Sequence, residues 1–300
     1  MFVIKFRKIF YSISIALIAV SLYGILSHGL KLGIDFKGGS IIEAEYSAAP
    51  NIDTIKANLT NIDLGEYSIR TTGDKGVILR TKNLSDVERV TLIADLTKDD
   101  TGASVKRFDS VGPILGEELR AKASKSIFFV ILAIVLFITF AFRGVSKPVS
   151  SWKYGLVAIA ALLHDVIVPT GVFAFLGYYQ GVEIDSLFVT ALLVVLGFSV
   201  HDTIVVFDRT RENLHKNNKE KSKKTFSEIV GISVSQTFAR SINTSLTTLI
   251  ALAVLYVYGP EATQNFSLAL LIGIAAGTYS SIFIGSPLLV TLEKWQRKEN

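Results

Sequence analysis

The chain has 300 residues, of which half are hydrophobic and 19% are charged, and its net charge is +5. A mean hydropathy of +0.45 excludes an ordinary soluble domain and indicates a membrane protein. Because the sequence contains no cysteine, disulfides, thiolate metal sites and thiol catalysis are also excluded.

Apolar runs long enough to cross a bilayer, about 20 residues each, recur along the chain. The pattern predicts six transmembrane helices, near residues 9–30, 124–142, 154–177, 185–206, 240–258 and 264–290. The first run follows three cations, as in a signal peptide, but it is longer than the roughly 7–15 residues of a signal-peptide core. We therefore expect a retained anchor, with residues 1–30 forming the N-terminus and the first span.

The residues between the first two spans, 31–122, predict a soluble α+β domain. Two stretches with helical spacing, "NIDTIKANLTNI" and "LSDVERVTLIADLTK", alternate with strand-like stretches, two of which flank the hairpin signal "GDKG". The order strand–helix–strand–strand–helix–strand is typical of a ferredoxin-like fold. The domain has no recognisable metal or nucleophile constellation, which favours a binding or lever role.

Residues 123–292 predict a five-helix membrane domain, with a basic connection over 207–239 and a tail over 293–300. Every alternate connection is rich in Lys and Arg, which predicts that both termini lie in the cytoplasm. The basic residues of these connections are Arg143, Lys147 and Lys153, then Arg209, Arg211, Lys216, Lys219, Lys221, Lys223 and Lys224, and finally Lys294, Arg297 and Lys298.

Ionisable residues lie inside or at the edge of the apolar spans: His164, Asp165, His201, Asp202 and Arg240. A charged side chain at the bilayer centre costs about 2.5–3.5 kcal/mol, so such groups face the bundle interior, pair with one another or line water. Counting along the helices places these residues at a similar depth, where Asp202 and Arg240 can form an ion pair. A pair that opens and closes would switch the proton affinity of the acid, as a proton relay requires.

Each of these residues has an alternative interpretation. Asp202 could be a structural partner of Arg240 that never titrates, and Arg240 alone could extend to the lipid headgroups. His164 and Asp165 could form a satisfied polar contact between helices. His201 could titrate near neutral pH, or it could act as a hydrogen-bonding spacer.

Several motifs carry a family resemblance that covers nearly the whole chain. "LGIDFKGGS" follows the first span, "ALLHDVIVPTG" lies in the third, "GFSVHDTIVVFDRTREN" ends the fourth and "ARSINTSLTTL" opens the fifth. In these motifs the chain resembles the SecF family of protein-export membrane proteins, part of the resistance–nodulation–division superfamily. The length and the predicted topology agree with that resemblance.

The resemblance implies a function and a set of partners. The family forms a complex with SecD, which supplies the other six spans, in the bacterial inner membrane, and the domain over 31–122 would be periplasmic. The complex works beside the SecYEG channel and SecA, often with YajC and YidC. It uses the proton-motive force, without a cofactor, to complete export of a preprotein after SecA-driven translocation. No nucleic acid takes part.

The resemblance also assigns site residues. The family's intramembrane Asp corresponds to Asp202, and the Arg that opens its fifth span corresponds to Arg240. His201 stands where relatives usually carry Asn, which changes the hydrogen bonding beside the acid. The remaining essential acid of the family lies in SecD, so this chain would hold only part of the relay. His164 and Asp165 are secondary candidates.

Two other functions stay open. The superfamily also contains proton-coupled exporters of small molecules, which would predict larger outer domains with a drug-sized, aromatic-lined pocket. A purely structural scaffold of the translocon would need none of the ionisable residues. An enzyme is disfavoured because the sequence contains no HExxH, GxSxG or phosphate-binding loop, and we assign no catalytic, cofactor-binding or metal-binding residue.

Overall fold

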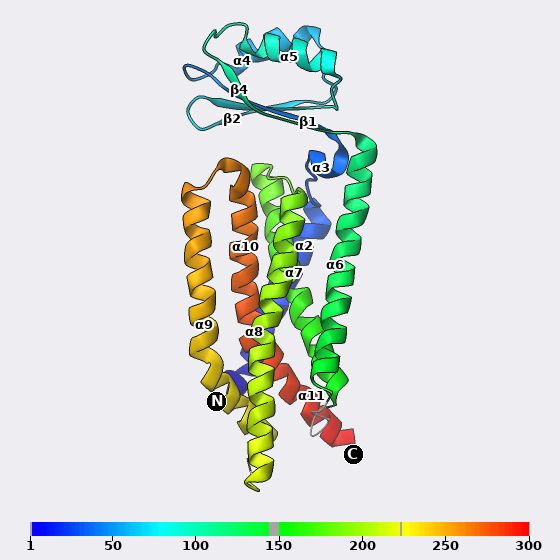
Figure 1. The fold of residues 1–300 in the computed structure, drawn as a ribbon, viewed down its shortest axis with the longest axis vertical. Helices are drawn as coiled ribbons and strands as arrows, with labels where there is room; N and C mark the ends of the chain where they lie inside the picture. Colours follow the sequence, from blue (N-terminus) through cyan, green and yellow to red (C-terminus); the bar gives the residue numbers. More distant parts are fainter. Residues whose placement is uncertain (1, 144–149, 223, 300) are drawn as a thin grey trace. The chain divides into compact units, whose positions relative to one another are not determined.

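The computed structural model describes residues 2–143, 150–222 and 224–299 (Figure 1). The chain divides into two compact units. The larger unit comprises Met1–Lys31 and Lys125–Asn300, and the smaller one comprises Leu32–Ser124. Lys147 and Lys223, two of the cations that predict the orientation, lie outside the described residues.

The smaller unit is an antiparallel sheet with two helices on one face (Figure 1). Its main elements are β1 (Gly39–Glu45), α4 (Ile52–Asn58), β2 (Ser68–Thr72), β3 (Gly76–Thr81), α5 (Asp86–Thr97) and β4 (Ser104–Val111). The short helices α3 (Ile34–Lys37) and η1 (Leu59–Asn61) precede β1 and follow α4. The strand order β2-β3-β1-β4 and the chain order of the elements confirm the predicted ferredoxin-like fold.

Alternation along the strands creates the core of this unit. Ile42 in β1 and Leu79 in β3 are registered partners, and both side chains are buried. They belong to the same hydrophobic cluster as Leu92 and Leu96, which lie one turn apart on α5. Side chains two residues apart in the strands and four residues apart in the helix therefore pack into one core.

The "FKGG" motif is explained by a tight approach between two segments of the smaller unit. Gly38 and Gly39 have positive φ angles of 77° and 133°, a conformation that side chains other than glycine rarely adopt. A Cβ at Gly38 would lie 2.8 Å from the backbone of Pro113, where the helix α6 (Pro113–Ala141) begins. The two glycines therefore allow the chain to enter β1 directly beside α6.

The larger unit contains the membrane helices (Figure 1). Besides α6 they are α2 (Arg7–His28), α7 (Ser151–Gln180), α8 (Ser186–Lys219), α9 (Phe226–Tyr258) and α10 (Glu261–Ser280). A short α1 (Phe2–Lys5) precedes α2, and a π-helical turn η2 (Ser281–Gly285) joins α10 to α11 (Ser286–Glu299). Among the described residues six helices are long and apolar enough to span a bilayer, so the predicted six spans are confirmed.

The polar ends of α8 and α9 correct one expectation. Residues 207–239, expected as a connection, are largely helical, since only residues 220–225 separate the two helices. An ion pair between Arg209 and Glu212 at 2.5 Å has the helical i,i+3 spacing and supports the end of α8. Thr225 and Glu228 form a capping box that starts α9. The helices therefore extend past the apolar runs that signalled them.

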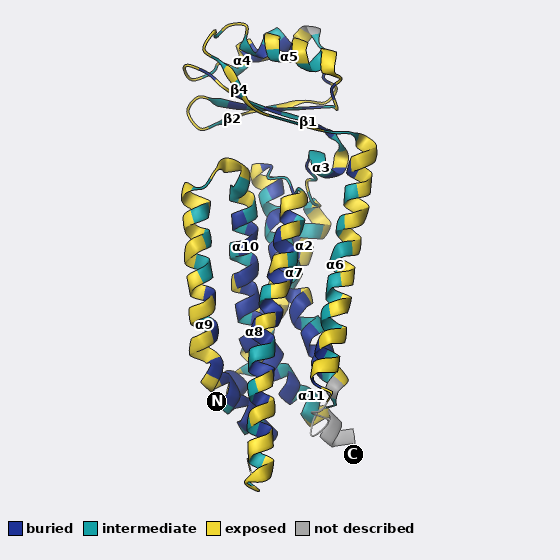
Figure 2. Cartoon of the chain, in the orientation of Figure 1, coloured by how far each residue is buried: buried dark blue, intermediate teal, exposed yellow. Residues whose placement is uncertain are grey.

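Three helices form the centre of the larger unit (Figure 2). The apolar windows of α7, α8 and α10 are at least half buried, whereas those of α6 and α9 are only 6% and 11% buried. Close packing of α10 on α8 depends on glycine. A Cβ at Gly273 would lie 2.3 Å from Val195, and one at Gly277 would lie 2.9 Å from Ser199. The polar side chains described below lie around this α8–α10 contact.

Candidate functional site

Asp202 is buried on the central helix α8, with 5% of its surface exposed. Its Oδ1 accepts a hydrogen bond of 2.7 Å from Ser241 Oγ on α9. Its Oδ2 is buried and has no hydrogen-bond partner among the described residues. A buried carboxylate oxygen without a donor is costly, and it leaves a lone pair free to accept a proton.

Hydroxyl groups continue from Asp202 across two further helices. One turn along α9 from Ser241, Ser245 Oγ donates to the Ser241 carbonyl at 2.9 Å. Thr278 Oγ1 on α10 donates to Ser245 Oγ at 2.6 Å. The surroundings of Asp202 are thus built from α8, α9 and α10 together.

Arg240 does not form the predicted ion pair with Asp202. Its side chain is exposed, and no ion pair within 4 Å joins the two in the described part of the chain. Successive residues on an α-helix point about 100° apart, so when Ser241 faces α8 its neighbour faces elsewhere. Arg240 instead lines a pocket of about 370 Å³ formed with α6 and α8. Its charge acts on the carboxylate only over a longer range.

His201 also points away from the acid. It precedes Asp202 in the chain, yet its side chain is exposed whereas that of Asp202 is buried. Among the described residues His201 forms no hydrogen bond with the carboxylate, so the geometry does not support a hydrogen-bonding spacer role within this chain. The charge of His201 reaches Asp202 only through space.

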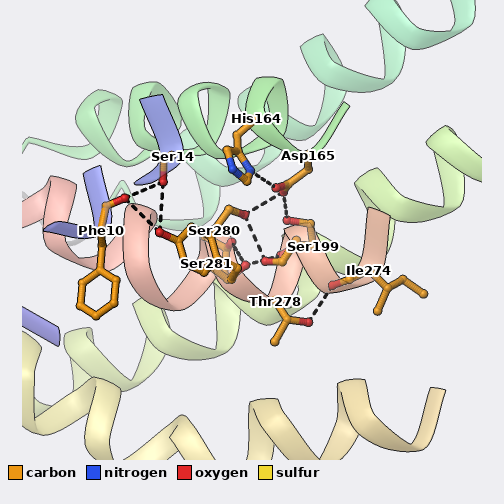
Figure 3. A network of polar contacts seen from close by, with 12 residues as sticks. Phe10, Ser14, His164, Asp165, Ser199, Ile274, Thr278, Ser280 and Ser281 are labelled. Carbon is orange, nitrogen blue, oxygen red and sulfur yellow. Dashed lines mark hydrogen bonds and ion pairs between the residues drawn. The ribbon is translucent and has the colours of Figure 1, made fainter. Parts of the chain in front are cut away.

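The second acid, Asp165 on α7, is fully buried and has several donors (Figure 3). His164 Nδ1 lies 3.0 Å from its Oδ1. Two hydroxyls donate to its Oδ2, Ser199 of α8 at 2.5 Å and Ser280 of α10 at 2.9 Å. The carboxylate therefore joins the three central helices, which is the interhelical polar contact considered as the alternative for His164 and Asp165.

His164 connects this centre to the first span. Its Nε2 is buried and has no hydrogen-bond partner in the described part of the chain, and its ring stacks on Tyr279 with centroids 5.9 Å apart. The Tyr279 hydroxyl donates to the Phe10 carbonyl of α2 at 2.9 Å, and Ser14 donates to the hydroxyl at 3.4 Å (Figure 3). The polar contacts thus extend from α7 to α2.

The π-helical turn η2 lies where the two acidic centres approach each other. Thr203, the residue after Asp202, forms a hydrogen bond of 2.8 Å with Ser281 at the start of η2. Ser281 also donates to the carbonyl of Ser199, a partner of Asp165, at 3.1 Å. Single π turns inside helices are frequent at functional sites. The Ser281 hydroxyl of η2 thus contacts Thr203, the neighbour of Asp202, and Ser199, the partner of Asp165.

The hydroxyl partners Ser199, Ser241 and Ser280 were not predicted from the sequence. A signal was present in "TYSS" and "RSINTS", because several hydroxyl residues in or beside an apolar run need acceptors inside the bundle. Among the described residues no group of three or more His, Cys, Asp or Glu side chains could hold a metal ion. The chemistry that this site offers is proton binding and hydrogen bonding.

These features define a polytopic membrane protein with an α+β domain between its first two spans and two buried carboxylates in its bundle. Residues 92–295 match the family of protein export membrane protein SecD/SecF, C-terminal, and residues 23–50 match the SecD/SecF GG motif. The chain belongs to the SecF family of protein translocase subunits, as the sequence resemblance implied.

Relatives of known family cover almost the whole chain. The protein translocase subunit SecF of Thermobaculum terrenum is 41% identical over 99% of this chain and 94% of that protein. SecF of Anaerolinea thermophila is 38% identical over 96% of this chain and 92% of that protein.

Two solved structures share the fold. SecDF of Thermus thermophilus, a translocon-associated membrane protein, superposes with a TM-score of 0.81 at 29% identity and covers 98% of this chain. SecDF in a super-membrane-facing form gives a TM-score of 0.69 at 28% identity over 99% of this chain. This chain spans only 38% and 39% of those two SecDF chains.

Proposed function

We propose that this chain acts with SecD as the auxiliary subunit that uses the proton-motive force to complete preprotein translocation. The observation that carries the proposal is Asp202, a buried carboxylate in a membrane helix with one oxygen left unpaired. Such intramembrane acids are functional by default because of their cost. Membership of the SecF family supplies the process that the proton would drive.

The contrast between the two acids supports Asp202 as the proton carrier. Asp165 already accepts two hydroxyl hydrogen bonds at Oδ2 and lies against His164 Nδ1 through Oδ1, so both of its oxygens are engaged. Asp202 has one donor and a free Oδ2, so a proton can bind without breaking a contact. In this proposal Asp165 and His164 hold the central helices together, while Asp202 binds and releases the proton.

Arg240 provides a means of releasing the proton from Asp202. Arg240 precedes Ser241, whose hydroxyl donates to Asp202. Rotation or sliding of α9 would therefore replace this neutral donor with a cation beside the carboxylate. A guanidinium beside a carboxylate favours the ionised form and would expel the proton. The ion pair predicted from the sequence would then belong to another conformation of the same site.

Exposed polar side chains at membrane depth support SecD as the partner. Arg240, Asn243 and Thr247 are exposed at spacings of three and four along α9, and His201 is exposed on α8. Groups of this kind avoid lipid and face protein or water. This chain matches only 38% and 39% of the two SecDF chains. The remaining part of such a chain is long enough to supply helices that would cover this face.

The remaining parts of the proposal follow the family. The complex would lie in the bacterial inner membrane with both termini in the cytoplasm and residues 31–122 in the periplasm. There it would work beside SecYEG, SecA, YajC and YidC on the emerging preprotein. The chain would need no cofactor and would catalyse no covalent reaction of its own.

The small-molecule exporter is less well supported by the smaller unit. A pocket of about 390 Å³ lies between the end of β1 and α4. Tyr46 is the single aromatic residue among the described residues that line it, and Asp99 and Asp100 add negative charge. A drug-binding pocket of this superfamily was expected to be aromatic-lined, so this pocket does not favour export of apolar molecules.

The test is preprotein translocation into inverted vesicles that contain this chain and the SecD of the same organism, with and without a proton-motive force. Asp202→Asn should abolish the stimulation by the proton-motive force and leave SecA-driven translocation intact. Ser235→Ala, at an exposed position on α9, is the control and should behave as wild type. Full stimulation in Asp202→Asn would falsify the proton role and favour the scaffold.

A further inference from the structure

A basic pocket lies where α1, α2 and α9 begin. Its volume is about 430 Å³, and it is lined by Ile4, Lys5, Arg7, Lys8 and Ser227. Three of these five residues are cations that immediately precede or open the first span. The pocket therefore lies at a membrane boundary, at the level of lipid headgroups.

The pocket is held in place by packing. Val3 and Ile4 of α1 are 8% and 5% exposed and belong to the hydrophobic core of the larger unit. The chain turns at Phe6 between α1 and α2, so the cations lie on both sides of this turn. Because α1 is anchored by its apolar side, the cations do not belong to a frayed terminus.

No carboxylate of the described residues neutralises the positive charge of the pocket in an ion pair, and Lys5 Nζ lies 5.6 Å from the centroid of the Phe6 ring. None of Lys5, Arg7 and Lys8 forms an ion pair in the described part of the chain. Ser227 lies in the first turn of α9, where the helix dipole adds partial positive charge. The neighbouring acid, Glu228, is engaged in the helix cap, where its Oε2 accepts from the backbone N–H of Thr225 at 2.7 Å.

Exposed apolar side chains lie beside the cations. Phe2 and Ile9 are 64% and 55% exposed, and Phe6 between them is also exposed. The Phe2 ring lies 4.9 Å from that of Phe6 and 5.9 Å from that of Phe10, so these aromatic residues form one surface. A cationic pocket adjoining an apolar surface matches a molecule with an anionic head and hydrocarbon tails.

We propose that this pocket binds the headgroup phosphate of an anionic phospholipid. Lys5, Arg7 and Lys8 bind the phosphate, and the acyl chains lie along Phe2, Phe6 and Ile9. Arg suits phosphate because its guanidinium donates two parallel hydrogen bonds. The proposal does not depend on the proton role of Asp202, since it concerns a different group of residues.

The end of α8 offers a matched comparison within the same chain. Lys219, Lys221 and Lys224, at and just after this end, are also three exposed cations without an ion pair in the described part of the chain. In the described part of α8 beyond Val194, however, no large apolar side chain is exposed. If only net charge attracted anionic lipid, the two clusters would contribute equally.

The experiment is native mass spectrometry of the full-length chain, released from vesicles that contain phosphatidylglycerol and phosphatidylcholine in equal amounts. The wild type should retain phosphatidylglycerol in preference to phosphatidylcholine. Lys5→Gln/Arg7→Gln/Lys8→Gln should lower that retention on the order of a hundredfold, since each cation near an anionic surface contributes about fivefold. Lys219→Gln/Lys221→Gln/Lys224→Gln, with the same loss of charge, should retain the lipid.

The triple substitution could impair membrane insertion, so single substitutions accompany it. Lys5→Gln and Lys8→Gln each leave two cations before the span, and each should lower retention about fivefold. Equal retention of the two lipids, or equal losses in the two triple variants, would overturn the proposal. So would displacement of the lipid by millimolar inorganic phosphate, because that result would indicate a site for a free anion.

Discussion

The Asp202 carboxylate on α8 accepts a hydrogen bond of 2.7 Å from Ser241 on α9, and its second oxygen is buried without a donor among the described residues. This contact joins a central helix to one whose apolar window is only 11% buried. The acid is thus held by a helix whose membrane-spanning surface is largely exposed in this chain. Motion of α9 would change the surroundings of Asp202 directly.

The first prediction concerns this contact. Ser241→Ala should lower the translocation that depends on the proton-motive force roughly ten- to a hundredfold, because the carboxylate loses the donor that orients it, a bond worth roughly 1.5–3 kcal/mol. Ser241→Thr keeps a hydroxyl and should restore most of the activity. The measurement is the same vesicle assay, and an unaltered rate in Ser241→Ala would show that the contact plays no part.

The second prediction separates the two acids. Asp165→Ala should destabilise the chain by about 2–3 kcal/mol, because it leaves the buried hydroxyls of Ser199 and Ser280 without this acceptor and removes the partner of His164 Nδ1. Asp202→Ala removes the acceptor of only one donor and should cost less. Unfolding of the two variants in detergent, followed by circular dichroism, gives the comparison. Equal losses would contradict the assigned roles.

The third prediction tests the glycine contact between α10 and α8. Gly273→Ala should destabilise the chain by about 1–3 kcal/mol, because its Cβ would lie 2.3 Å from Val195. Gly197→Ala is the control on α8, since a Cβ there meets nothing within 4 Å. It should be neutral or stabilising, because alanine favours a helix by about 1 kcal/mol over glycine. The same unfolding measurement would contradict the packing if both variants behaved alike.

The fourth prediction concerns acid pH and the smaller unit. The backbone N–H and the hydroxyl of Ser47, with the Gly102 N–H, hold the pKa of Asp100 below its ordinary value of 3.8. A lowered pKa means that this contribution to stability is complete above pH 3.8 and is lost as the pH falls through the lowered value. Hydrogen exchange around Ser47, corrected for intrinsic rates, should therefore be faster at about pH 3 than at about pH 6.

The control for this prediction is Asp100→Asn, which removes the titrating group. Its corrected exchange around Ser47 should be faster than in the wild type at about pH 6 and should change little on acidification. An identical pH dependence in Asp100→Asn and the wild type would attribute the effect to another group. Glu45 pairs with Lys106 at the same end of β1. Glu45→Gln leaves Asp100 in place, so this second control should keep the pH dependence around Ser47.

Much of the architecture could be predicted from the sequence because the signals are local. Bilayer thickness sets the length of an apolar helix, so six such runs predicted six spans. Alternation in the strands, helical spacing and the "GDKG" turn determined the element order of the ferredoxin-like unit. The presence of Asp165 and Asp202 within apolar helices followed from the same count. The ends of the helices could not be predicted from hydropathy, because charged side chains extend α8 and α9 through local ion pairs and caps.

Only the tertiary structure decided which side chains meet. From the sequence Arg240 was expected beside Asp202, yet a difference of one residue, about 100° of helix rotation, places Ser241 there instead. Ser199 and Ser280 reach Asp165 from 34 and 115 residues away in the chain. Hydropathy records how deep a residue lies but not which way its helix is turned, and that rotation is fixed only when all the helices pack together.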